Sequence, residues 1–208
     1  MIISISGKKE SGKNTVASIF QLLKSEGYIE TGRIYNEPYI QTVERMIKQN
    51  LATPLLELSS DWKQVSFAYK IKQCVALITG CKVSNLDNPE FKKKLWNGVS
   101  YREMMQKLGT EVGRNIYTDI WVRGLLDEYT EDKNWIITDT RFPNEVQALR
   151  ELGAIFVKVE CTSDIHTDEH ISEKALDKYK FRNIISAERG DIKSLVNQTQ
   201  ELIKRLEL

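Results

Sequence analysis

The strongest constraint on the fold is the order of three patterns at the start of the chain. Ile2, Ile3 and Ile5 form a short β-branched run that is typical of a buried strand. The glycine-containing stretch SGKKESGKNT follows at residues 6–15, and apolar positions then recur with helical spacing as far as Gly27. A strand, a glycine loop and a helix in this order predict the first unit of an α/β sheet.

The remaining strand and helix patterns alternate along the chain. Short apolar runs predict four further strands, at residues 65–68, 135–139, 155–160 and 183–186. Helical spacing predicts helices at residues 102–108, 112–126, 144–152 and 192–206. Strands that alternate with helices indicate a parallel sheet covered on both faces.

The domain organisation follows from length and from two polar stretches. A chain of 208 residues is long enough for one substantial core, so we expect a single domain over residues 1–208. Residues 31–64 lack strand patterning and contain a helical piece near residues 43–50, and we interpret them as an insertion beside the core. Residues 162–182 are polar, connect two predicted strands, and form a candidate lid.

Composition excludes some classes of protein. The chain has 30 basic and 29 acidic side chains, and this balance argues against a dedicated nucleic-acid binder. No apolar stretch approaches the roughly 20 residues of a membrane-spanning helix, so no membrane partner is expected. Three cysteines in no C-x-x-C spacing suggest neither a disulfide framework nor a thiolate metal site, and the cytoplasm is the expected compartment.

The glycine loop has the form of a phosphate-binding loop. Glycines allow successive N–H groups to point at phosphate oxygens, the helix N-terminus adds partial positive charge, and Lys13 can reach the terminal phosphates. A glycine-rich turn with a solvated lysine is the alternative. The residues expected to bind the donor are Gly7, Lys8, Ser11, Gly12, Lys13, Asn14 and Thr15.

A carboxylate and a guanidinium follow the predicted strand at 135–139. Asp139 at the strand end has the form of a Walker B carboxylate, which would hold Mg²⁺ together with Thr15. Arg141 lies two residues further and could clamp a transferring phosphoryl group. The alternative is an ion pair between Arg141 and Glu145 across one helical turn.

Several motifs in series are similar to those of the bacteriophage-type deoxynucleoside monophosphate kinases. The family loop G-x-x-x-S-G-K-[DN]-T is matched by residues 7–15, and a Phe-Ala segment with a following Lys by residues 67–72. The block R-E-x-x-Q-x-L-G-T-E-x-x-R matches residues 102–114, D-x-R-F-x-N-E matches residues 139–145, and H-x-S-E matches residues 170–173. The resemblance implies a five-stranded P-loop kinase that uses ATP with Mg²⁺ to phosphorylate a deoxynucleoside monophosphate.

The same resemblance assigns roles to individual side chains. It implies Lys13, Arg114 and Arg141 as catalytic residues, with the substrate bound by Lys72, Arg102, Arg114, Trp121, Arg141 and Glu145. Each cation could instead be an ordinary surface charge, and Trp121 could be part of the core rather than a stacking partner for a base. The sequence leaves a homodimer open.

The sequence departs from the family in two places. Where the family commonly has Arg-Pro after the fourth strand, this chain has Glu160-Cys161-Thr162, so a lid arginine would come from Arg182 or Arg189. Asn14 stands where a Walker loop usually has a hydroxyl, and Thr15 supplies that hydroxyl one residue later, as in the G-K-G-T of adenylate kinases.

Three other functions remain as alternatives. The chain could be a kinase of another small phosphorylated metabolite, or a nucleotide-binding regulatory or assembly ATPase, because both share the donor side of the site. The stretch from His166 to His170 also fits H-x-x-E-H, the inverted zinc-protease signature. That segment is polar, and these are the chain's only two histidines.

Overall fold

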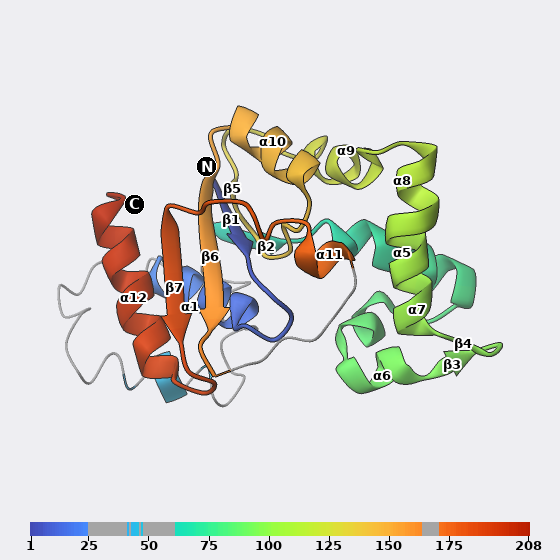
Figure 1. Cartoon of the computed structure of the whole chain (residues 1–208), viewed down its shortest axis with the longest axis horizontal. Coiled ribbons are helices and arrows are strands. Elements are labelled where there is room, and N and C mark those ends of the chain that lie inside the picture. Colours follow the sequence, from blue (N-terminus) through green and yellow to red (C-terminus); the bar gives the residue numbers. More distant parts are fainter. Residues whose placement is uncertain (25–40, 42, 46, 48–60, 164–170) are drawn as a thin grey trace. The chain divides into compact units, whose positions relative to one another are not determined.

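The computed structural model describes residues 1–24, 41, 43–45, 47, 61–163 and 171–208. The chain divides into two compact units (Figure 1). We call Met1–Val65 with Glu131–Leu208 the sheet unit, and Ser66–Thr130 the helical unit. No helix within the described part of the chain has the length and apolar character needed to cross a membrane.

The sheet unit is built on five parallel strands in the order β2-β5-β1-β6-β7. In chain order they are β1 (Ile2–Ser6), β2 (Trp62–Val65), β5 (Asn134–Ile137), β6 (Ile155–Cys161) and β7 (Asn183–Ala187). β1 is central and fully buried, as its run of isoleucines predicts. The α/β fold with a five-stranded parallel sheet is therefore confirmed.

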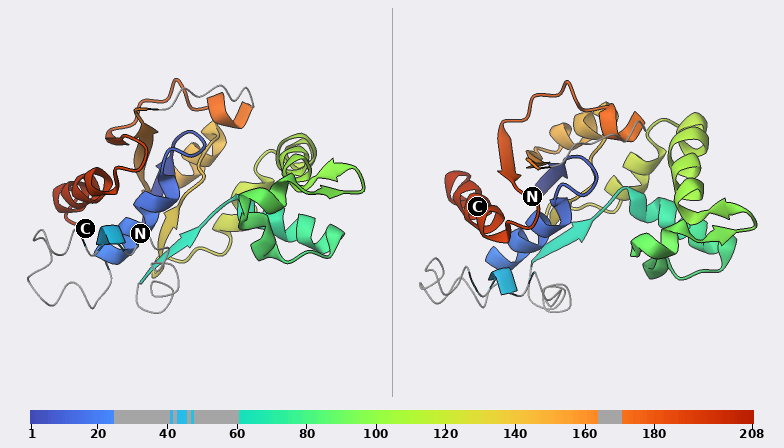
Figure 2. Two further views of the ribbon diagram at one scale, coloured as in Figure 1. Left: turned by 90° about the horizontal axis from the view of Figure 1, so that it is seen from below. Right: turned by 60° about the horizontal axis from the view of Figure 1, so that its bottom comes forward.

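Helices cover both faces of this sheet (Figure 2). They are α1 (Lys13–Leu23), α10 (Pro143–Glu151), α11 (Ile171–Lys174) and α12 (Ile192–Arg205). α1 and α12 pack on one face, and α10 and α11 lie over the other. α12 begins where Asp191 accepts a hydrogen bond from the backbone N–H of Ser194 at 2.9 Å, which satisfies one of the free donors of its first turn.

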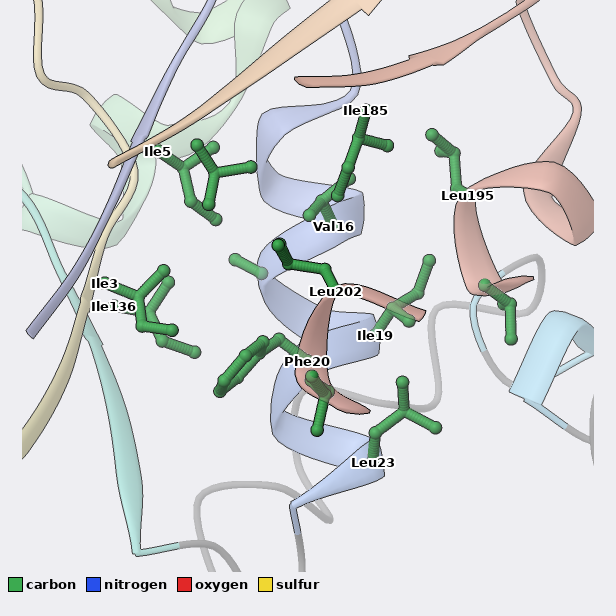
Figure 3. Packing of buried hydrophobic residues seen from close by; sticks show 14 of the residues in the cluster. Ile3, Ile5, Val16, Ile19, Phe20, Leu23, Ile136, Ile185, Leu195 and Leu202 are labelled. Carbon is green, nitrogen blue, oxygen red and sulfur yellow. The ribbon is translucent and has the colours of Figure 1, made fainter. Parts of the chain in front are cut away.

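The core of the sheet unit lies between the sheet, α1 and α12 (Figure 3). Ile3 and Ile5 of β1 face Val16, Ile19 and Phe20 of α1, and all five side chains are almost fully buried. Burying a side chain of this size stabilises the fold by about 1.5–3 kcal/mol. This packing anchors the glycine loop, because the loop joins the two elements that supply it.

Strand β2 lies three residues earlier than the predicted strand at 65–68. Trp62 is buried and packs edge-on against Phe20 with the ring centroids 4.9 Å apart. The amide of Gln21 donates to the carbonyl of Trp62 at 2.6 Å and accepts from Gln64 at 2.6 Å. These contacts with α1 favour residues 62–65 in the sheet. Most of the predicted insertion at 31–64 lies outside the described residues.

The helical unit consists of short elements. They are α5 (Ala68–Thr79), a 3-10 helix (Val83–Asp87), α6 (Pro89–Lys93), the hairpin β3 (Leu95–Trp96) and β4 (Val99–Ser100), α7 (Tyr101–Gln106), a π-helical turn (Lys107–Val112), α8 (Gly113–Ile116) and α9 (Ile120–Leu126). Val75, Ala76, Leu86 and Tyr101 form its small core.

The predicted helix at 112–126 is broken into α8 and α9. Tyr117 is extended, with φ −157° and ψ 121°, and ends α8. Beyond the break, the indole N–H of Trp121 donates to the carbonyl of Gly109 at 2.8 Å. A Cβ on Gly113 would lie 2.4 Å from the Trp121 ring, so only glycine allows this packing. The chain therefore turns back on itself where the sequence pattern is continuously helical.

Candidate active site

The glycine loop joins the C-terminal end of β1 to the start of α1. Gly7 has φ +149°, and a Cβ there would lie 2.2 Å from the carbonyl oxygen of Val159 on β6. Gly12 has φ +96°, in the left-handed region that favours glycine. Both glycines of the predicted loop are thus required by its geometry: one by a close approach and one by its backbone angle.

The mouth of the loop offers hydrogen-bond donors to a ligand. Among the described residues, no side chain caps α1, and its first turn contains no acidic residue. The hydroxyl of Ser11 is buried and has no hydrogen-bond partner in the described part of the chain. Free N–H groups at a helix N-terminus and an unsatisfied hydroxyl suit the phosphate oxygens of a nucleotide.

Lys13 is buried at the base of this loop, only 9% exposed. Its Nζ donates to the carbonyl oxygen of Gly7 at 2.8 Å and also to that of Lys8. Burial, followed by repulsion from Arg141, lowers the pKa of Lys13 to about 7, while the Asp139 carboxylate acts in the opposite direction. A phosphate beside Lys13 would favour its charged form.

Arg141 is held by the loop that precedes α10. The buried carboxylate of Glu145 accepts hydrogen bonds from the backbone N–H groups of Arg141 at 2.7 Å and of Phe142 at 3.0 Å. The hydroxyls of Thr140 and Ser4 are bonded at 2.8 Å, which ties this loop to β1. Glu145 therefore fixes the backbone from which Arg141 projects, and a direct contact with substrate stays a prediction.

Asp139 lies two residues beyond the end of β5, and its charge reaches Lys13. The structure thus brings Lys13, Asp139 and Arg141 together at one edge of the sheet. No group of three His, Cys, Asp or Glu side chains suited to a metal occurs among the described residues. A single carboxylate fits a Mg²⁺ ion that takes most of its ligands from nucleotide phosphates and water, and the role of Thr15 as a further ligand stays a prediction.

The other predicted substrate residues all lie in the helical unit. Lys72 pairs with Asp87 at 2.5 Å, and Arg114 donates to the carbonyl of Thr118 at 3.4 Å. Arg102 is half-buried on α7. Trp121 is buried and donates a hydrogen bond to the carbonyl of Gly109. Of the two roles that the sequence left open, this position fits a core residue.

The polar connection at 162–182 is described in part. His166 and His170, and with them the H-x-x-E-H motif, lie outside the described residues. Residues 171–182 contact the glycine loop and Arg141: Asp177 pairs with Lys8, and Ser172 accepts from the Arg141 guanidinium at 3.4 Å. Arg189, a candidate lid arginine, lies 3.8 Å from Glu10 of the loop, and Arg182 is exposed.

Three residues near the site were not among the predicted site residues. Lys158 on β6, Ser172 and Asp177 line an open pocket of about 30 Å³ beside Gly7 and Lys8. Ser172 belongs to the H-x-S-E motif, and Lys158 carried a signal of its own, because a lysine within the apolar run IFVKVE is unusual.

A glycine loop joins the central strand of a parallel sheet to an uncapped helix, and a lysine, a carboxylate and an arginine lie at its mouth. This is the architecture of P-loop kinases. The sequence model of the family described as deoxynucleotide monophosphate kinase matches residues 47–199. The chain belongs to this family.

The names of individual relatives agree with this family. The chain is 27% identical over 111 residues to the deoxynucleotide monophosphate kinase of Escherichia phage RB69, and 27% identical over 113 residues to that of Enterobacteria phage T4. These matches span about half of the chain (50% and 51%) and less than half of the two phage proteins (45% and 46%). A protein of Acanthamoeba polyphaga mimivirus, provisionally named a deoxynucleotide monophosphate kinase, is 25% identical over 213 residues, which cover 95% of this chain and 93% of that protein.

Proposed function

We propose that this protein transfers the γ-phosphoryl group of ATP to the 5′-phosphate of a deoxynucleoside monophosphate, giving the diphosphate. The observation that carries the proposal is the meeting of Lys13, Asp139 and Arg141 at the mouth of the glycine loop. Membership of the deoxynucleotide monophosphate kinase family favours this reaction over a regulatory ATPase or a kinase of another metabolite.

The donor side of the site is the glycine loop. The N–H groups at the start of α1, the Ser11 hydroxyl and Thr15 would bind the phosphates of ATP, while the exposed Asn14 lies beside them. Asp139 would hold Mg²⁺ through water or directly. When bound, Mg²⁺ neutralises charge on the phosphates and holds them in a fixed arrangement.

Lys13 and Arg141 do the electrostatic part of the reaction. The donor and acceptor phosphates are both anions, and bringing them into line is opposed by their mutual repulsion. Lys13, released from the carbonyls of Gly7 and Lys8, would follow the charge of the transferred group, and Arg141 would lie between the two phosphates. No general base is required, because the acceptor phosphate is already ionised at neutral pH.

The acceptor side draws on the helical unit. Lys72, Arg102 and Arg114 are the cations proposed to bind the acceptor, in addition to Arg141. Lys72 would exchange its partner Asp87 for the nucleotide, because an ion pair at the surface is weak. The polar connection at 162–182 would close over the site and exclude water. Three free cysteines support a reducing compartment, the cytoplasm.

A coupled assay with ATP and each of the deoxynucleoside monophosphates tests the proposal. We expect ADP to form only when an accepted monophosphate is present. Lys13→Met should lower kcat at least 100-fold, whereas Lys63→Met on the exposed edge of β2 should not change it. ADP formation without any acceptor would instead favour the regulatory ATPase, and full activity of Lys13→Met would rule out the proposed role of the loop.

A further inference from the structure

We propose that the pocket beside the glycine loop is a second phosphate subsite, and that Lys158, which lies outside the loop, is its central binding residue. The subsite would take the 5′-phosphate of the acceptor nucleotide. The assignment rests on the proposed function for the identity of the nucleotide, but the presence of a phosphate site does not.

The pocket lies on the α10 face of the sheet. Its walls come from the end of β1, the first residues of the glycine loop, Arg141, Lys158 on β6, and the segment from Ser172 to Phe181. Lys158 pairs in the sheet with Ser6, the last residue of β1, so it lies next to the point where the loop begins. The pocket therefore adjoins the donor loop and shares its first residues, Gly7 and Lys8.

Positive charge dominates the lining of this pocket. Lys8, Arg141 and Lys158 line it together with one carboxylate, that of Asp177. A second carboxylate, Glu160, lies outside the lining and pairs with Lys158 at 2.7 Å. Even with both carboxylates ionised, the cations are in excess, so the pocket favours a bound anion over a neutral ligand.

The surroundings suit a phosphate group in particular. The hydroxyls of Ser6 and Ser172 lie at the walls, and a hydroxyl can donate a hydrogen bond to a phosphate oxygen. Leu176, which is buried, and Phe181 form an apolar wall that reduces the water around the cations and so strengthens their attraction for an anion. Lys158 is itself largely buried, with 28% of its side chain exposed.

Asp177 would compete with a bound phosphate for the ammonium group of Lys8. Its carboxylate pairs with Lys8, although half of the side chain (51%) is exposed to solvent. An exposed ion pair is weak, whereas a phosphate dianion that accepts several charge-assisted hydrogen bonds is held more strongly. A bound phosphate would therefore displace Asp177 from Lys8. Removal of the Asp177 charge should make the subsite bind phosphate more tightly.

Arg141 explains why the phosphate would belong to the acceptor. Its guanidinium reaches Ser172 at 3.4 Å on the pocket side, while its charge also acts on Lys13 at the donor loop. An anion in the pocket and the donor phosphates would therefore share Arg141 as a counter-charge. A cation shared by both phosphates reduces the repulsion that opposes bringing them together.

Steady-state kinetics of two opposing variants test the subsite. Lys158→Met should raise the KM for the deoxynucleoside monophosphate about tenfold, or about 1.4 kcal/mol, and leave the KM for ATP within twofold. Asp177→Asn should change the acceptor KM in the opposite direction, lowering it two- to threefold. Lys180→Met, an exposed lysine on the same connecting segment, is the matched control and should leave both constants unchanged.

Opposite shifts from the two variants cannot come from general damage to the fold. If Lys158→Met raised the KM for ATP instead, the subsite would hold a donor phosphate, and the assignment to the acceptor would be overturned. If neither constant changed, the subsite itself would be refuted.

A binding measurement separates failure of the subsite from failure of the proposed reaction. Inorganic phosphate should raise the midpoint of thermal unfolding, relative to chloride at equal ionic strength, in the wild type and in Lys180→Met. In Lys158→Met this rise should be at least halved, and any phosphate bound at the glycine loop contributes equally to all three proteins. Equal stabilisation of wild type and Lys158→Met would overturn the subsite, whether or not the protein phosphorylates any nucleotide.

Discussion

The Nζ of Lys13 donates a hydrogen bond of 2.8 Å to the carbonyl oxygen of Gly7, so the loop binds its own lysine with backbone oxygens. Neutral carbonyls compensate a buried ammonium only in part, and the pKa of Lys13 is accordingly lowered to about 7. A large fraction of Lys13 is therefore neutral in the free protein near pH 7, and a bound anion would favour its charged form.

Proton uptake on ATP binding should report the change in the charge of Lys13. At pH 8 the lysine is mostly neutral in the free protein, and the phosphates of ATP are already fully ionised. Binding raises the pKa of Lys13, so the complex should take up close to one proton, and affinity should fall as pH rises from about 7 towards 10. Titration calorimetry at pH 8 in two buffers of different ionisation enthalpy measures the uptake. No uptake would mean that Lys13 does not meet the phosphates.

Gly7→Ala should damage the loop far more than a substitution at another glycine with positive φ. The new Cβ would lie 2.2 Å from the Val159 carbonyl, so β6 and the loop must separate. We expect a loss of about 2–4 kcal/mol in the free energy of unfolding and no measurable ATP binding. Gly153→Ala is the control, because Gly153 has φ +71° and nothing within 4 Å of its Cβ position. It should cost only about 1 kcal/mol. Similar losses from both would contradict the close approach at Gly7.

Glu145→Ala should act on catalysis through the backbone. Removal of the carboxylate leaves the N–H groups of Arg141 and Phe142 without this acceptor, at a cost of about 2–3 kcal/mol in stability. Because Arg141 loses its fixed position, kcat should fall at least tenfold while the KM for ATP changes little. Glu151→Ala, at the exposed end of the same helix, is the control. Wild-type kcat in Glu145→Ala would show that the position of Arg141 does not depend on Glu145.

Trp121→Phe distinguishes a core role from base stacking. Phenylalanine keeps an aromatic ring but cannot donate to the buried Gly109 carbonyl, so the free energy of unfolding should fall by about 1–3 kcal/mol. Chemical denaturation measures this loss, and the acceptor KM should stay within twofold of the wild type. Unchanged stability with a raised acceptor KM would support stacking on a base instead.

Much of the fold and of the donor site could be predicted from local patterns. Residues 2–23 specify a strand, a loop and a helix because apolar spacing and glycine positions act over a few residues, and both glycines serve the loop as expected. Helix α12 follows its amphipathic pattern for the same reason. The position of Asp139 and Arg141 near Lys13 could be predicted because strand ends in a parallel sheet meet at one edge.

Contacts between distant residues decided the rest. Strand β2 is set by Gln21 and Trp62, and the break between α8 and α9 by the packing of Trp121 on Gly113, although neither segment differs locally from the predicted pattern. The pocket joins Lys8 to Asp177, which are 169 residues apart in the chain. The sequence by itself determined the sheet architecture and the loop that is proposed to bind the donor. Only the tertiary structure decided which polar side chains meet beside that loop, because the sheet order, and not the order of the chain, makes β1 and β6 neighbours.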